Sequence, residues 1–138
     1  MSKYFQSAEQ LYDVFEGFFN ALRTHPTLAP RVLKLGNNLR FLIEDPVAEM
    51  TVDTKTPGGR VIMGPSDVAC EIVMRMKADA GHRFWLGDLN LMLALTKREI
   101  VVERGALSSI LQLLPVLKPA HAIYRETLRN KGWVCQPK

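Results

Sequence analysis

Hydrophobic residues near the start of the chain repeat with the period of a helix. Ser7 and Gln10 have the spacing of a capping box, which marks a helix start. The apolar stripe that follows consists of Leu11, Val14, Phe15, Phe18, Phe19 and Leu22. These positions fall on one face of a helix. The helix is predicted to end at His25, because a residue that precedes a proline avoids the helical conformation.

The period changes after a short second helix, predicted from about Pro30 to Leu35 with Gly36 as its stop. In "NLRFLIED" and "AEMTVDT", apolar and polar residues alternate, which predicts a hairpin of two half-buried strands. The inward positions are Leu39, Phe41, Ile43, Ala48, Met50 and Val52, and the outward positions of the second strand are Glu49, Thr51 and Asp53. "KTPGG" predicts a turn, and "RVIM" a third strand.

The second half of the chain adds three predicted helical segments and one strand. "GPSDVACEIVMRM" is interpreted as a helix that Ser66 or Asp67 caps, with Cys70 packed on its inner side. Residues 78–98 alternate partly like a strand, but their Leu, Met and Ala content favours a helix, with Asp88 as a cap. "EIVVER" predicts a strand that Gly105 closes.

The apolar stretch "GALSSILQLLPVLKPAHAIYRETL", residues 105–128, predicts a closing helix that Pro115 and Pro119 bend. Its expected inward stripe is Leu107, Ile110, Leu111, Leu114 and Leu117. Helices grouped around a run of strands indicate an α+β fold, with an antiparallel or mixed sheet of four to five strands.

Composition is typical of one globular domain, with 47% hydrophobic and 23% charged residues. We expect a single domain over residues 1–138, with a core at about 7–130 and a short basic tail at 131–138. No apolar run has the length of a spanning helix, and Met1 to Gln10 do not resemble a signal peptide. Cys70 and Cys135 lack metal-ligand spacing, so reduced thiols and a cytoplasmic location are expected.

The net charge of +4 resides near the C-terminus. In residues 118–138, Glu126 is the only acid, and the basic residues are Lys118, Arg125, Arg129, Lys131 and Lys138. Two interpretations remain open: a solvated helix end whose cations suit the helix dipole, and a peripheral contact with anionic lipid head groups.

The sequence indicates no catalytic residue, no metal site and no cofactor. His25, His82 and His121 lack zinc-ligand spacing. Glu49 and Asp53 share a strand face that can carry acid and base, but a solvated face is the favoured interpretation. No phosphate-binding loop and no basic patch interleaved with aromatics is present, so nucleic acid is not expected as a partner.

Apolar faces exceed what a small core needs, and flexible methionines contribute to several of them. A plain packed core with methionine as filler is the alternative interpretation. The order of motifs over about Leu11–Leu128 resembles the sterol carrier protein type 2 family. The similar segments are "FLIEDPVAEMTVDTK", "VIMGPSDVACEIV" (a strand, then a capped helix), "LNLMLALTKREIVVERG" and "ALSSILQLLPVL". The segment between Lys55 and Ser66 is short, which leaves the family's fifth strand open.

The resemblance implies a sheet covered by helices on one side. It also implies a tunnel that binds a sterol, fatty acid, acyl-CoA or isoprenoid without converting it chemically. The expected tunnel lining is Phe41, Ile43, Met50, Val52, Met63, Ile72, Met76, Phe84, Trp85, Leu89, Leu93, Ile100, Leu107, Ile110, Leu111 and Leu114. The last helix is expected to shift so that the lipid can enter and leave the tunnel. The expected function is lipid transfer or presentation by a monomer or homodimer. The alternative is an accessory subunit of ubiquinone biosynthesis that holds a polyprenylated precursor for partner enzymes.

Overall fold

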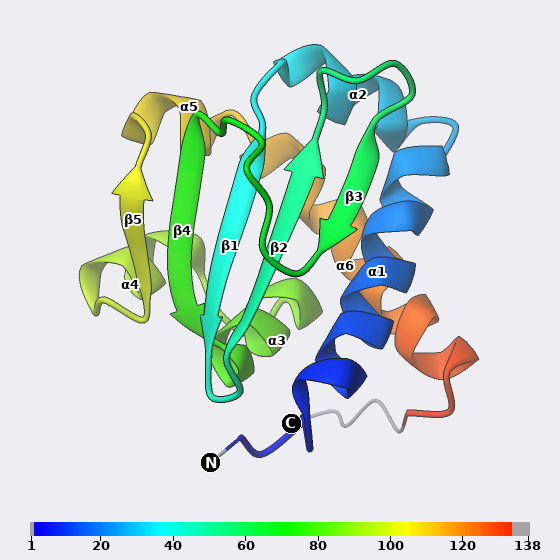
Figure 1. Ribbon diagram of the computed structural model, residues 1–138, viewed down its shortest axis with the longest axis vertical. Coiled ribbons are helices and arrows are strands. Elements are labelled where there is room, and N and C mark those ends of the chain that lie inside the picture. The colour runs from blue at the N-terminus through cyan, green and yellow to red at the C-terminus, as the bar shows by residue number, and fades with distance from the viewer. Residues whose placement is uncertain (1, 134–138) are drawn as a thin grey trace.

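A mixed five-stranded sheet forms the centre of the protein, seen in a computed structural model that describes residues 2–133 (Figure 1). The strands are β1 (Leu39–Glu44), β2 (Ala48–Asp53), β3 (Arg60–Met63), β4 (Ile72–Lys77) and β5 (Ile100–Arg104). Their spatial order is β3-β2-β1-β4-β5. β1 and β4 pair in parallel, and the other neighbours are antiparallel. The α+β class and the mixed sheet of up to five strands are therefore confirmed.

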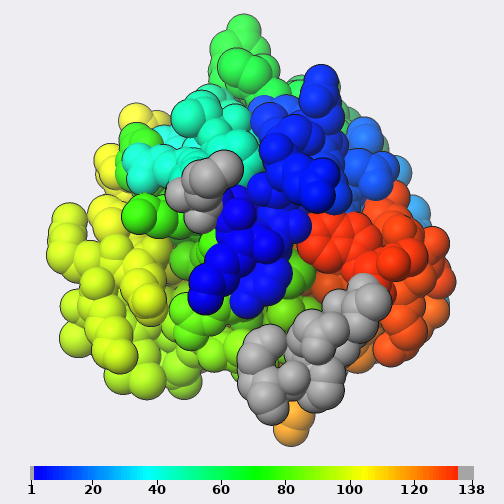
Figure 2. Space-filling view, turned by 90° about the horizontal axis from the view of Figure 1, so that it is seen from below, coloured from blue at the N-terminus to red at the C-terminus, as the bar shows by residue number. Residues whose placement is uncertain are grey.

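The helices pack mainly behind one face of this sheet (Figure 1). They are α1 (Ala8–Thr24), α2 (Leu28–Leu35), α3 (Ala78–Leu86), α4 (Leu91–Thr96), α5 (Leu107–Leu111) and α6 (Leu114–Asn130). Seen from below, the N-terminal segment, in blue, lies beside α6, in red (Figure 2). Phe5 is buried there, with its ring 5.5 Å from that of Trp133.

Both predicted helices are present, although α2 begins at Leu28, two residues before the predicted start, and hydrogen bonds explain their boundaries. Ser7 Oγ accepts from the Gln10 N–H at 3.1 Å, which caps α1. His25 ends α1, and its Nδ1 accepts from the backbone N–H groups of Thr27 and Leu28, both at 3.1 Å. His25 therefore caps the start of α2.

The helix predicted over residues 64–76 is wrong. Residues 64–71 form a loop that crosses the front of the sheet, and β4 follows it (Figure 1). Ser66 Oγ accepts from the Val68 N–H, which makes a local turn in place of a helix cap. Cys70 is buried as expected, but in this loop. Tertiary pairing of β4 with β1 outweighs the local helical pattern.

The structure also overturns the expectation that Thr51 and Asp53 face solvent, whereas Glu49 stays partly exposed. Thr51 and Asp53 are 0% and 4% exposed. Arg40, the cross-strand partner of Thr51, donates from Nη2 to the backbone oxygens of Ser66 at 2.9 Å and Val68 at 2.6 Å. The loop therefore lies over this part of the outer face and covers it.

The two long helical stretches of the second half are each divided. Residues 78–98 form α3 and α4, and Asn90 caps α4 through Oδ1, where Asp88 was expected. The closing helix is two helices, because the chain turns at Gln112 and Leu113. Pro115 lies in the first turn of α6, where its missing N–H costs no bond. Pro115 therefore lies at the start of a helix and does not bend it. Pro119, in contrast, lies inside α6, as predicted for a proline of the closing helix.

Candidate binding cavity

An apolar cavity lies between the inner face of the sheet and the helices. Its volume is about 80 Å³, counted as space open to the centre of a water molecule. Its lining residues come from six helices and five strands or their ends: Phe19, Leu22, Arg23, Ala29, Val32, Leu33, Leu39, Phe41, Val52, Asp53, Thr54, Gly59, Arg60, Val61, Met74, Met76, Phe84, Trp85, Leu91, Ile100, Ile110, Leu113, Val116 and Leu117. One water needs about 10–15 Å³ on this measure. The cavity therefore has room for several water-sized groups.

The alternation of side chains along the strands determines which residues form the sheet side of the cavity. Leu39 and Phe41 of β1 pair with Ile72 and Met74 of β4, so the inward positions of two parallel neighbours form one apolar surface. The Phe41 ring stacks on Phe19 of α1 at 5.7 Å. Helix and sheet are thereby held together at the side of the cavity.

Helix α2 forms part of the opposite wall. Ala29, Val32 and Leu33 line the cavity, while Arg31 and Lys34 are exposed on the helix. Spacings of one, three and four residues put the lining side chains on one side of a short helix. The helix is therefore an amphipathic cover with a polar outer surface.

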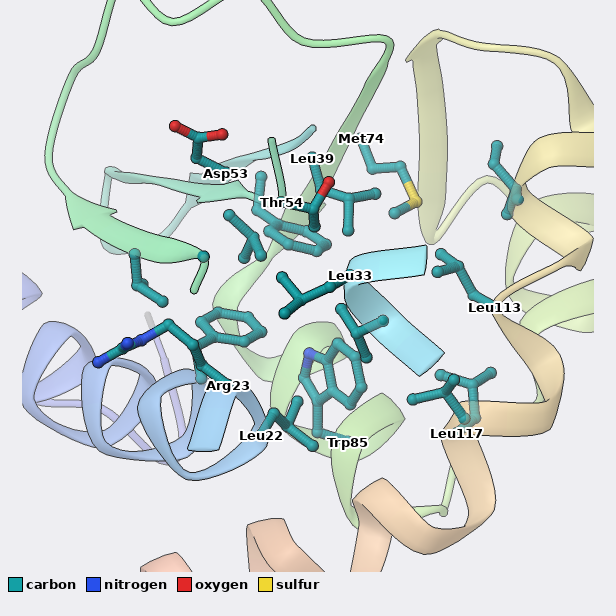
Figure 3. A pocket seen from close by; sticks show the side chains of 18 of the residues that line it. Leu22, Arg23, Leu33, Leu39, Asp53, Thr54, Met74, Trp85, Leu113 and Leu117 are labelled. Carbon is teal, nitrogen blue, oxygen red and sulfur yellow. The ribbon is translucent and has the colours of Figure 1, made fainter. Parts of the chain in front are cut away.

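The polar lining residues gather at one end of the cavity. Arg23, Asp53, Thr54 and Arg60 come from the end of α1 and from the β2–β3 connection. Figure 3 shows Arg23 and Asp53 on the side opposite Leu113 and Leu117. We call these four residues the polar end. These residues line the cavity mainly through carbon atoms, so their polar groups lie beside the apolar cavity and not inside it.

Asp53 is fully partnered at this end. Its Oδ1 accepts from the backbone N–H groups of Lys55 at 3.0 Å and Thr56 at 3.2 Å, and its Oδ2 accepts from Thr56 Oγ1 at 2.7 Å and Arg60 Nε at 2.8 Å. Burial raises the pKa of Asp53, but the hydrogen bonds from Thr56, Arg60 and Lys55 outweigh it and hold that pKa well below its usual range. Asp53 is therefore a structural anion that fixes the β2–β3 turn.

Arg23 packs along the same turn. A Cβ on Gly59 would lie 3.4 Å from Arg23 Cγ and 3.0 Å from Leu33 Cδ2. Gly59 also has a φ of +70°, a conformation that glycine adopts without strain. The absence of a side chain at Gly59 thus lets the turn approach both α1 and α2.

The structure brings together part of the tunnel lining expected from the sequence. Among those residues, the cavity is lined by Phe41, Val52, Met76, Phe84, Trp85, Ile100 and Ile110. The others lie outside its lining: Ile43, Met50, Met63, Ile72, Leu89, Leu93, Leu107, Leu111 and Leu114. Leu107 and Leu114 are 49% and 43% exposed, because the break between α5 and α6 turns them outward.

Several lining residues were not expected. Leu39 has the same strand parity as Phe41, so alternation alone would have included it. Met74 was not predicted as a lining residue, because a helix was predicted over residues 64–76. Ala29, Val32 and Leu33 belong to a helix whose period is visible in the sequence, but only the fold shows what that helix covers.

Outside the cavity, His82 is 4% exposed and its Nδ1 lies 2.7 Å from the Tyr124 hydroxyl, so it is a core residue.

Within residues 2–133, no group of three or more His, Cys, Asp or Glu side chains is arranged to hold a metal ion. In the same range no helix is both long and apolar enough to cross a membrane. Cys135 and Lys138 lie outside the described residues, as does most of the predicted basic tail.

No model of a known protein family matches the sequence, and no curated protein matches it. Solved structures do match the fold. The sterol carrier protein domain 2 of Helicoverpa armigera superposes with a TM-score of 0.66 at 13% identity, covering 88% of this chain and 94% of that one. Sterol carrier protein 2 of Aedes aegypti, in complex with the C16 fatty acid palmitate, gives 0.57 at 21% identity, covering 78% and 93%.

A third match is the UbiJ-SCP2 ubiquinone synthesis protein, with a TM-score of 0.57 at 16% identity, covering 79% of this chain and 87% of that one. The chain therefore has the fold of the sterol carrier protein 2 class, as the sequence resemblance implied. The fifth strand, which the short segment after Lys55 left open, is present as β4.

Proposed function

We propose that the protein binds a single-chain lipid, such as a fatty acid, in its apolar cavity and carries or presents it without chemical change. The observation that supports this most is the lining, whose surface is almost entirely apolar. Each buried methylene contributes about 0.8 kcal/mol. A chain of about ten methylenes would thus gain roughly 8 kcal/mol before the costs of ordering.

We infer the orientation of the ligand from the polar residues beside one end of the cavity. Its head group would lie by Arg23, Thr54 and Arg60, and its tail would extend toward α5 and the start of α6. A long chain needs more room than about 80 Å³, so the walls must move apart when it binds. Met74 and Met76 are flexible side chains that can adapt to this change.

The test is direct binding of palmitate, together with mass spectrometry of organic extracts from the purified protein. Leu33→Trp places a large side chain in the cavity, and Lys34→Trp places the same side chain on the outer side of α2. The first variant should bind palmitate at least about tenfold more weakly, since it displaces ligand methylenes. The second should bind like wild type. Equal binding by both variants would refute the cavity as the lipid site.

A second candidate is an accessory role in which the lipid is held for partner enzymes. The likeness to UbiJ-SCP2 is what favours it. An isoprenoid quinone precursor in the organic extract, together with recovery of biosynthetic enzymes by a tagged copy of the chain, would support this role. Extraction of fatty acids without such partners would favour a carrier.

A further inference from the structure

Helix α4 is apolar on both of its sides. Leu91 is 6% exposed and lines the cavity. The next two residues, Met92 and Leu93, are 46% and 55% exposed. An amphipathic helix ordinarily places polar residues on its outer side. The outer side of this cavity wall is apolar instead.

The α5–α6 segment has the same property. Ile110 and Leu113 line the cavity from inside, while Leu107 and Leu114 are exposed on the outside. Within residues 2–133, the exposed large apolar side chains are these two, Met92 and Leu93 of α4, and Val47 in the β1–β2 turn. Apart from Val47, they all belong to segments that wall the cavity.

These segments are also free of acidic residues. Residues 89–98 and 105–125 contain no Asp or Glu, and the acids between these two ranges, Glu99 and Glu103, pair with Arg83 and Arg75. Lys97, Arg98 and Lys118 are exposed there, and none forms an ion pair with another residue of the described chain. We call the exposed apolar and basic residues together the β5-edge surface: Met92, Leu93, Lys97, Arg98, Leu107, Leu114 and Lys118.

The β5-edge surface lies away from the chain's N-terminal segment. Figure 1 shows α4 and α5 at the two ends of β5, on the outer edge of the sheet. From below, the yellow-green region around residues 90–100 forms the flank opposite the red end of α6 (Figure 2). The surface is thus separate from the end of α6, where the basic tail begins.

We propose that the β5-edge surface docks on an anionic lipid bilayer. Exposed leucine and methionine side chains enter the boundary between head groups and acyl chains, while flanking lysine and arginine attract anionic head groups. A second copy of the chain suits this surface poorly, because pairing two copies would bring their cations together. The proposal extends the proposed function, since the docked segments are walls of the same cavity.

The experiment measures binding of the full chain to vesicles by co-sedimentation. Wild type should bind vesicles of phosphatidylcholine mixed with phosphatidylglycerol, bind vesicles of phosphatidylcholine alone far less, and lose binding as salt is added. A double variant, Lys97→Gln with Lys118→Gln, should bind the anionic vesicles about 25-fold more weakly, at about fivefold for each cation removed. Leu93→Asp with Leu114→Asp should weaken binding at least as much.

Matched controls separate this surface from net charge and from general hydrophobicity. Arg31→Gln with Lys34→Gln removes two cations from α2, and Val47→Asp changes an exposed apolar residue elsewhere; both should bind vesicles nearly like wild type. Equal losses in controls and test variants would overturn the proposal. So would a self-associating wild type that Leu93→Asp with Leu114→Asp converts to a monomer. Palmitate binding without vesicles should be unchanged in every variant, so failure of the cavity function would be recognised separately.

Discussion

The two ends of the cavity differ in what holds their walls in place. At the polar end, side chains bond the backbone of several segments together. At the opposite end, where α4, α5 and the start of α6 meet β5, the walls are held mainly by apolar packing.

Asn38 illustrates the first kind of wall. It is 4% exposed, its Oδ1 accepts from the Thr54 N–H at 2.8 Å, and its Nδ2 donates to the Ala69 oxygen at 3.1 Å. Its own N–H donates to Glu71 Oε1 at 2.8 Å. One buried amide thus joins the start of β1, the end of β2 and the crossover loop.

The helices α5 and α6 illustrate the second kind. Their N-caps, Ala106 and Leu113, provide no side-chain hydrogen bond to the helix start. Ile110 is fully buried, yet Leu107 and Leu114 on the same segment are exposed. Few polar bonds must break for this segment to shift, so the cavity is expected to expand here while the polar end keeps its shape.

The largest expected effect is at the polar end. Asp53→Ala removes the acceptor for two backbone N–H groups, the Thr56 hydroxyl and Arg60, so we expect a loss of about 2–4 kcal/mol in the free energy of unfolding. Urea denaturation measures it. Glu44→Ala breaks a half-exposed pair with Arg75 and should leave the midpoint unchanged. Equal midpoints for Asp53→Ala and wild type would show that the polar end is not held by this carboxylate.

Acid should weaken the same end. The pKa of Asp53 is lowered in the folded protein from an ordinary value of 3.8. The stability that this shift provides is therefore fully present above about pH 4 and is lost as the pH falls through the folded pKa. One such group changes the unfolding free energy by at most about 1.4 kcal/mol per pH unit. Urea midpoints measured from pH 6 downward should fall less steeply for Asp53→Asn than for wild type, and parallel curves would contradict the assignment.

The contrast between the two ends also explains which elements could be predicted from the sequence. Local signals such as the Ser7 cap, the alternation around Phe41 and the stop at Gly36 determine their elements, so those elements were predicted correctly. Residues 64–76 were not, because β4 depends on parallel pairing with β1, a partner distant in the sequence. Leu107 and Leu114 share a helical period with Ile110, but the turn at Leu113 separates them in space. Site residues whose positions depend on such contacts between distant segments cannot be predicted from hydrophobic periodicity alone.

The smallest effect concerns the turn that closes the polar end, and a neighbouring glycine offers the control. Gly58 and Gly59 both have positive φ, so alanine at either should cost about 1–2 kcal/mol of stability. A Cβ at Gly58 would meet nothing within 4 Å, whereas one at Gly59 would meet Leu33 Cδ2 at 3.0 Å. Gly59→Ala should therefore push Leu33 toward the cavity and weaken palmitate binding by about two- to fivefold, the equivalent of about half to one buried methylene. Gly58→Ala should bind palmitate like wild type, and calorimetric titration of the two variants compares them. Equal affinities would mean that α2 moves freely against the turn, and the polar end would then be no more rigid than the end at β5.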